Sequence, residues 1–317
     1  MTPGLRDAAP SPAELDRGRV AELMEKVRQI EIRMRGLVES SFTGMYRAAF
    51  RGRGIDFDRV REYLPGDEIR TIDWNVTARS GRPFVKQFRE ERELTMMLLV
   101  DVSASGDFGS NDVKKREVAA ELACVLALSA IGNNDRVGLI LFSDRIERFV
   151  PPGKGRPHVF RLVREILGCK PVGRGTDIAA TFGVVGRLIH RRSLMFLISD
   201  LEVGAQRSAA LAALQRALRP VSQRHDVVAL HVRDPHEYAL PNVGTISVED
   251  AETGEVVSID TGRRKVRERF AEIARARAAE TERLLLRSNV DTVAIDTSRS
   301  FVPLLLRFFE ERSRRNR

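Results

Sequence analysis

Three oxygen-bearing side chains follow one apolar run at alternate positions: Asp101, Ser103 and Ser105. The run before them, residues 94–100, has the length and composition of a buried strand. In open α/β sheets, ligands bind beyond the carboxyl ends of strands, and a carboxylate with two hydroxyls suits Mg²⁺ or a similar cation. Asp and Ser are also ordinary turn and helix-capping residues, so this run alone leaves both interpretations open.

Two later residues favour the metal interpretation. Thr176 lies in a Gly-rich loop before a predicted helix, and Asp200 follows a second apolar strand. Loops that follow the carboxyl ends of strands gather at one edge of a doubly wound sheet, so these side chains could converge on one cation. The predicted ligands are Asp101, Ser103, Ser105, Thr176 and Asp200. They leave room for a carboxylate from a partner protein.

The elements that must position these residues follow from the alternation of short apolar runs with helical periodicity. Strands are predicted at 94–100, 136–142, 194–199, 226–232 and 291–295. Helices are predicted at 113–131, 157–167, 178–190, 206–218, 264–287 and 300–314. This alternation predicts an α/β fold with a doubly wound, mostly parallel sheet and helices on both faces. Residues 240–262 interrupt the alternation and indicate a hairpin-like insertion.

The chain before the sheet divides into two parts. Residues 1–12 contain three prolines and predict a flexible arm. Residues 13–93 predict an N-terminal helix over 13–40 and then a Gly-rich, turn-rich module with a small β element. The sheet domain is expected to occupy 94–317.

The predicted helix at 113–131 is apolar on almost every face. A helix on an open sheet needs only one apolar face, so we expect a second layer to cover this one. The N-terminal helix and the Gly-rich module are the candidates for that cover.

Composition limits the class of protein. The 317 residues carry a net charge of +9, and 43% of them are hydrophobic, as in globular proteins. The two cysteines form no zinc-binding motif, the start has no signal-peptide pattern, and the longest uncharged helical run is too short to span a bilayer. We therefore expect a soluble, cytoplasmic protein. The basic end, with Arg312, Arg314, Arg315 and Arg317, is either a solvated helix end or a contact for nucleic acid or lipid.

Two patterns in the sequence resemble known families. The order Asp101-x-Ser103-x-Ser105, Thr176, Asp200 resembles the metal-ion-dependent adhesion site (MIDAS) of von Willebrand factor A (vWA) domains. The segment Gly52–Pro83, GRGIDFDRVREYLPGDEIRTIDWNVTARSGRP, resembles the signature of the DUF58 family, which precedes an A-type domain. The chain departs from these patterns in having Ala104 where many such sites have Gly, and in lacking the upstream membrane helices of many family members.

The resemblance implies a function. DUF58 proteins are commonly encoded beside MoxR-type AAA+ ATPases and are thought to act with them in protein maturation or complex assembly. For this chain it implies a bacterial, chaperone-like adaptor that binds Mg²⁺ or another divalent cation. Its partners would be a MoxR-type ATPase and a client protein that presents an acidic side chain.

The Gly-rich module has a dense group of charges around the only tryptophan of the chain. The group comprises Asp67, Glu68, Arg70, Asp73, Trp74 and Arg79. One interpretation is a partner-docking surface with Trp74 as its aromatic anchor. The other, which we favour, is a structural network of turns and ion pairs in which Trp74 packs on the sheet.

Other functions fit the sequence less well. A Mg-dependent phosphatase of the haloacid-dehalogenase type needs a second Asp where this chain has Ser103, and a serine cannot serve there as an acid or base near neutral pH. The Gly-Lys-Gly loop at 153–155 is no P-loop. Nucleic-acid binding is permitted by the charge, but aromatic residues make up only 6% of the chain and no stacking motif is present. The prediction is a non-enzymatic binding protein.

Overall fold

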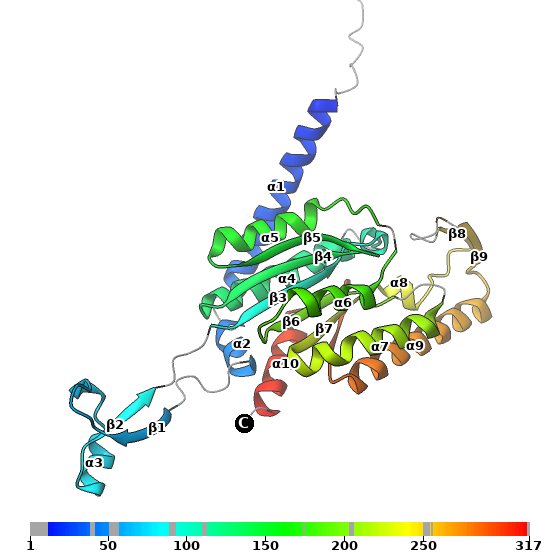
Figure 1. Cartoon of the computed structure of the whole chain (residues 1–317). Helices are drawn as coiled ribbons and strands as arrows, with labels where there is room; N and C mark the ends of the chain where they lie inside the picture. The colour runs from blue at the N-terminus through cyan, green and yellow to red at the C-terminus, as the bar shows by residue number, and fades with distance from the viewer. Residues whose placement is uncertain are drawn as a thin grey trace, which may run out of the picture.

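A computed structural model of the chain describes residues 12–38, 42–50, 57–88, 93–109, 113–173, 175–202, 206–249, 254 and 256–315. The predicted arm over 1–12 lies outside these residues except for Pro12, the first residue of helix α1. Within the described residues, a six-stranded sheet stands between two layers of helices (Figure 1). The predicted α/β fold is confirmed.

The sheet is built outward from β3 (Thr95–Asp101), the strand that ends in Asp101. Across the sheet the order is β10 (Asp291–Asp296), β7 (Asp226–Arg233), β6 (Leu194–Ser199), β3, β4 (Arg136–Phe142) and β5 (Ile146–Gly153). Neighbouring strands are parallel except β4 and β5, which are antiparallel. The chain therefore adds strands on one side of β3 and then crosses to the other side, as in doubly wound folds.

Alternate residues of β3 face the two helical layers. Met96, Leu98 and Val100 pack with the layer that contains α1 (Pro12–Leu37), α2 (Thr43–Phe50), α4 (Lys115–Gly132), α5 (Arg156–Gly168) and α10 (Val302–Arg315). Met97 and Leu99 pack with the layer of α6 (Ile178–Leu188), α7 (Arg207–Arg224) and α9 (Arg264–Arg287). Burial on both faces explains why β3 reads as a continuous apolar run.

Helix α4 is buried on almost every side, as its composition predicts. Helices α1, α2 and α5 pack against it, and Val27, Ile30 and Met34 of α1 belong to the same apolar core. The Lys26 ammonium also bonds to Glu117 of α4 at 2.6 Å. The N-terminal helix is therefore confirmed as a cover.

The segment 42–93, predicted as the Gly-rich module, supplies only part of this cover: its first residues form α2, which packs against α4, and its other described elements do not reach α4. Its antiparallel strands β1 (Phe57–Glu62) and β2 (Phe84–Phe88), its short helix η2 (Ile69–Thr71) and its helix α3 (Trp74–Ser80) pack mainly with one another. Figure 1 shows the module extending away from the sheet and its helices. Its polar, Gly-rich and Pro-rich sequence has too little apolar surface to close a core against α4.

Several elements were not predicted, among them α2 and α3 in the segment expected to be turn-rich. Strand β5 was missed because it is an edge strand with an irregular burial pattern and contains Pro151 and Pro152. The short helix α8 (Pro235–Tyr238) directly follows β7 and begins with a capping box formed by Asp234 and Glu237. The insertion at 240–262 contains the expected hairpin, with β8 (Thr245–Glu249) antiparallel to β9 (Val256–Asp260). Among the described residues, no helix has the length and apolar character needed to span a membrane.

Candidate metal and partner site

The candidate site lies at the carboxyl ends of β3 and β6. These two strands are neighbours in the sheet, with Val100 opposite Ile198. After β3 the chain enters α4 on one face of the sheet, and after β6 it enters α7 on the other face. Such a switch point is where open α/β sheets bind ligands, because the connecting loops diverge there and leave a crevice. Asp101 is the last residue of β3 and Asp200 directly follows β6, so the fold places both carboxylates at this point.

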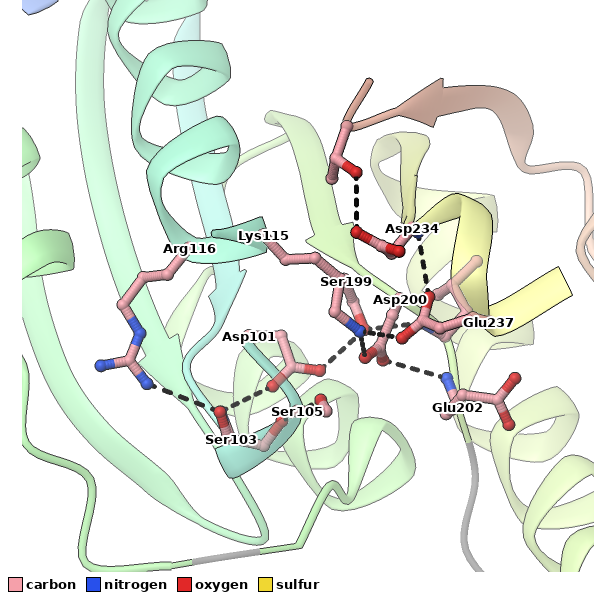
Figure 2. Close-up of polar contacts among 12 residues, drawn as sticks. Asp101, Ser103, Ser105, Lys115, Arg116, Ser199, Asp200, Glu202, Asp234 and Glu237 are labelled. Carbon is pink, nitrogen blue, oxygen red and sulfur yellow. Dashed lines mark hydrogen bonds and ion pairs between the residues drawn. The ribbon is translucent and has the colours of Figure 1, made fainter. Parts of the chain in front are cut away.

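Asp101 is only 8% exposed and is fixed by two hydrogen bonds. Its Oδ1 accepts the backbone N–H of Ser103 at 2.9 Å, and its Oδ2 accepts the hydroxyl of Ser199 at 2.7 Å (Figure 2). Burial and the nearby charge of Asp200 raise the pKa of Asp101 above its ordinary value. Both causes disfavour an isolated negative charge, and a bound cation would relieve both.

The two serines lie on the turn that follows β3, where η3 (Ala104–Asp107) begins. Their hydroxyl oxygens are 3.0 Å apart, and Ser105 also donates a hydrogen bond to Asp200. Ala104 lies in this short helical turn, in which the Gly106 N–H donates to the Ser103 carbonyl and the Phe108 N–H donates to the Ser105 carbonyl, both at 3.1 Å. The Asp-x-Ser-x-Ser pattern therefore brings all three of its side chains to one place.

A buried arginine of α4 supports the same turn. The Arg116 guanidinium donates to the carbonyl of Val102 at 3.0 Å and to the carbonyl of Cys169 at 3.1 Å. Val102 in turn donates its N–H to the carbonyl of Phe142 on β4. Arg116 thus joins the Asp101 turn to the loop that follows α5, and we regard it as a positioning residue.

Asp200 shares a buried ion pair with Lys115, the first residue of α4. The Lys115 ammonium is 2.7 Å from Asp200 Oδ2 and also contacts Glu237 of α8 (Figure 2). Burial raises the pKa of an aspartate, but the Lys115 charge outweighs it and lowers the pKa of Asp200. For Lys115 the balance is similar: burial lowers the pKa, the charges of Asp200 and Glu237 raise it, and the net shift is upward.

Thr176 lies on the loop just before α6 and is half-buried. Two contacts hold this loop to the β4–β5 hairpin. The Asp177 N–H donates to the Ser143 carbonyl in the turn at 2.9 Å, and the Gly173 N–H donates to Glu147 of β5 at 2.9 Å. Because Phe142 is paired with Asp101 across β4 and β3, the loop reaches the same edge of the sheet. Thr176 does not line the hollow between the two aspartates.

That hollow has a volume of about 20 Å³ and is lined by Asp101, Ser105, Gly106, Lys115, Ser199 and Asp200 among others. This is close to the room needed for a single water molecule or a bare metal ion. The two carboxylates and the hydroxyls of Ser105 and Ser199 line the hollow, whereas Ser103, a predicted ligand, does not. These are oxygen ligands of the kind that Mg²⁺ prefers, so the donor set fits a small divalent cation. Among the described residues, no group of three or more His, Cys, Asp or Glu side chains is placed to hold a metal ion, so a cation here would need the hydroxyls as ligands.

Sequence reasoning missed Lys115, Ser199 and Glu237. Lys115 carried a usable signal: a lysine in the first turn of a helix opposes the helix dipole, and here it opens a helix that is otherwise apolar. Such a residue calls for a carboxylate partner. Ser199 precedes Asp200 on a strand that is buried along its whole length, and its role depends on the pairing of β6 with β3. Glu237 is on α8, which the sequence did not predict.

The charged residues of the Gly-rich module have mixed roles. Asp67 makes a bidentate ion pair with Arg61, and the Asp73 side chain caps α3 by accepting the N–H groups of Asn75 and Val76. These contacts agree with the structural interpretation. The packing expected for Trp74 is wrong, since it is 66% exposed. Arg70 and Arg79 are also exposed, which keeps the docking interpretation open for those three residues.

The chain belongs to the DUF58 family. Residues 59–280 match the family described as "Protein of unknown function DUF58". The uncharacterized protein Rv1480 of Mycobacterium tuberculosis is 31% identical over 320 residues, covering 99% of this chain and 98% of the relative. The uncharacterized protein YeaD of Bacillus subtilis is 29% identical over 107 residues, covering 34% of this chain and 25% of that protein.

Solved structures similar to this chain include a conserved hypothetical protein and a VWA domain. The conserved hypothetical protein BatB from Bacteroides thetaiotaomicron is 16% identical, with a TM-score of 0.43 over 70% of this chain and 99% of that one. The VWA domain of SpRpn10 is 12% identical, with a TM-score of 0.35 over 68% of this chain and 94% of that one.

Proposed function

We propose that this protein is a non-enzymatic, metal-dependent adaptor that binds a protein partner at the carboxyl edge of its sheet. In this proposal Asp101, Ser103, Ser105, Thr176 and Asp200 hold Mg²⁺ or a similar cation, directly or through water. A client protein supplies an acidic side chain to the open position. A MoxR-type AAA+ ATPase is the second partner, and the protein acts with it in the cytoplasm in protein maturation or complex assembly.

The observation that supports this proposal is the pair of buried aspartates at the switch point. Asp101 and Asp200 lie at the ends of neighbouring strands, the charge of Asp200 disfavours the ionised form of Asp101, and both line a hollow about the size of an ion. A buried carboxylate without a charged partner is costly. Asp200 is paired with Lys115, whereas Asp101 has only hydrogen bonds among the described residues, so a cation beside Asp101 would stabilise this arrangement. The MoxR partner and the client are inferred from the resemblance to the DUF58 family and not from the geometry of the site.

The first test is metal binding by the full-length protein. Titration calorimetry with MgCl₂ and MnCl₂ should give a saturable signal for the unmodified protein and none for Asp101→Asn, which keeps the size of the side chain but removes its charge. Asp260→Asn is the matched control, because Asp260 is a partly exposed aspartate at the end of β9 in the hairpin insertion, and it should bind as the unmodified protein does. Equal binding by Asp101→Asn would contradict the ligand set.

The second test is capture of partners. The tagged full-length protein should retain a MoxR-type ATPase or a client from the lysate of its own bacterium in Mg²⁺, and should release the metal-dependent partner in EDTA. Asp101→Asn should lose the same partner without EDTA. A partner that is retained equally in EDTA and by the variant would show binding that does not depend on the metal. A steeply salt-dependent affinity for nucleic acid, unaffected by EDTA, would favour the alternative function.

A further inference from the structure

Lys115 places a positive charge inside the site that is proposed to bind a cation. Lys115 is only 3% exposed, and its ammonium lies between Asp200 and Glu237 (Figure 2). The centroid of the Phe108 ring is 5.9 Å from the ammonium. Burying an ammonium is costly unless it is well paired. The position is also unfavourable for a lysine because the amino end of α4 is itself positive. The two carboxylates therefore hold Lys115 in place.

The Lys115 ammonium contacts Asp200, one of the proposed metal ligands. Asp200 Oδ2 accepts Lys115, and Asp200 Oδ1 accepts the N–H of Glu202 at 3.2 Å. Both oxygens of Asp200 thus accept hydrogen bonds within the protein, and Ser105 is a further donor to this carboxylate. A carboxylate oxygen can accept more than one partner, but Lys115 lines the same hollow as Asp101 and Asp200, so its positive charge opposes a divalent ion that would share Asp200.

Glu237 provides Lys115 with a second carboxylate that does not line the hollow. Its other oxygen accepts the N–H of Asp234 at 3.0 Å within the capping box of α8. Glu237 is therefore fixed by its own helix and does not depend on Asp200. Lys115 can leave Asp200 and still keep one anionic partner.

We propose that Lys115 is a built-in counter-cation that competes with the divalent ion for Asp200 and stays paired with Glu237 when the ion binds. The inference rests on the proposed metal site and adds its regulation: Lys115 sets the affinity for the metal, and Glu237 sets how readily Lys115 gives way.

Calorimetric titration of the full-length protein with MnCl₂ and MgCl₂ tests this inference. Lys115→Met keeps the length of the side chain and removes its charge, and it should bind the ion at least about tenfold more tightly than the unmodified protein. The matched control is Lys114→Met, which makes the same charge change one residue earlier at an exposed position. It should change the affinity by less than about threefold, because solvent screens exposed charges.

A double-mutant cycle separates the role of Glu237 from a general loss of negative charge. Glu237→Gln should weaken metal binding, because Lys115 is then left with Asp200 alone. In the Lys115→Met background the same substitution should have little effect, since no ammonium remains to be held. Equal effects of Glu237→Gln in both backgrounds would overturn its role as the alternative partner.

The outcomes distinguish this inference from the proposed function. If the unmodified protein binds the ion and Lys115→Met binds it no more tightly, the inference is overturned and the metal site stands. If only Lys115→Met binds, the inference is supported and Lys115 is the resident cation of the native site. If neither binds, both are overturned. If Lys115→Met does not fold without metal, its thermal unfolding is measured in about 10 mM MnCl₂, where binding to the folded state should raise the unfolding temperature. The Glu237→Gln titration then tests the role of Lys115 without changing Lys115 itself.

Discussion

The Ser199 hydroxyl donates to Asp101 Oδ2 at 2.7 Å, joining residues that are 98 positions apart in the chain. Ser199 ends β6 and Asp101 ends β3, so this bond connects the two strands at which the chain reverses its direction of sheet growth. It also fixes the orientation of a carboxylate that is proposed to bind the metal. The contact exists only because these two strands are neighbours.

Ser199→Ala should destabilise the protein by about 1.5–3 kcal/mol, since the hydrogen bond it removes is made to a buried charged group. Urea unfolding monitored by circular dichroism measures this change. Ser129→Ala is the control: Ser129 is also buried, but its hydroxyl bonds to the helical carbonyl of Val125, and its loss should cost about 1 kcal/mol or less. A Ser199→Ala cost no greater than that of Ser129→Ala would show that the bond contributes little.

Arg116→Met should loosen the turn that carries Ser103 and Ser105. It removes the donors to the carbonyls of Val102 and Cys169, and the unsatisfied carbonyls should lower stability by about 2–4 kcal/mol. Hydrogen exchange should show faster exchange over residues 102–107 than in the unmodified protein. Arg136→Met, at an exposed ion pair with Glu93, should change stability by no more than about 1 kcal/mol.

Gly173→Ala should disturb the loop that carries Thr176. A Cβ at Gly173 would collide with the side chains of Ser143 and Asp144, which belong to the turn that anchors this loop. We expect a loss of about 1–3 kcal/mol in stability and several-fold weaker binding of Mn²⁺ by calorimetry. Gly183→Ala is the control, because α6 leaves open space around Gly183, and alanine there should stabilise the helix by about 0.5–1 kcal/mol. Unchanged metal affinity in Gly173→Ala would argue against Thr176 as a ligand.

Trp74 should report an exposed environment and contribute little to stability. It is the only tryptophan of the chain and is 66% exposed, so its fluorescence should have a red-shifted maximum and be readily quenched by acrylamide. Trp74→Phe should leave unfolding unchanged within about 0.5 kcal/mol, whereas Asp73→Ala, which removes the cap of α3, should cost that helix about 1 kcal/mol. Loss of a captured partner with Trp74→Phe would support docking at the module, and a blue-shifted emission would contradict the exposure.

The two thiols should differ in reactivity. Burial raises the pKa of Cys124 to about 12 and also raises the pKa of Cys169, which is only partly buried. Because the thiolate is the reactive form, a disulfide reagent should modify Cys169 slowly in the folded protein, faster as the pH rises from 7 to 9. Cys124 should react only after unfolding in guanidinium. Two rapidly reacting thiols in the folded protein would contradict the packing of α4.

Much of the fold followed from local pattern. The predicted strands at 136–142 and 194–199 and the predicted helix at 264–287 agree with β4, β6 and α9 to the residue, because each is an apolar or amphipathic run with clear ends. β5 and α8 did not stand out, since an edge strand has no regular burial pattern and a single helical turn has no periodicity. The composition of α4 predicted that a second layer covers it, but the sequence predicted only some of the segments that form this layer.

The sequence by itself determined which oxygen ligands could form the site, because Asp101, Ser103 and Ser105 lie within five residues of one another on a turn whose local geometry brings them together. Only the tertiary structure decided what surrounds them. Parallel pairing of β3 and β6 brought Ser199 and Asp200 to Asp101, and the packing of α4 and α8 brought Lys115 and Glu237 to Asp200. Charge compensation in a buried site depends on distances of a few ångströms between remote segments, and spacing along the chain does not encode them.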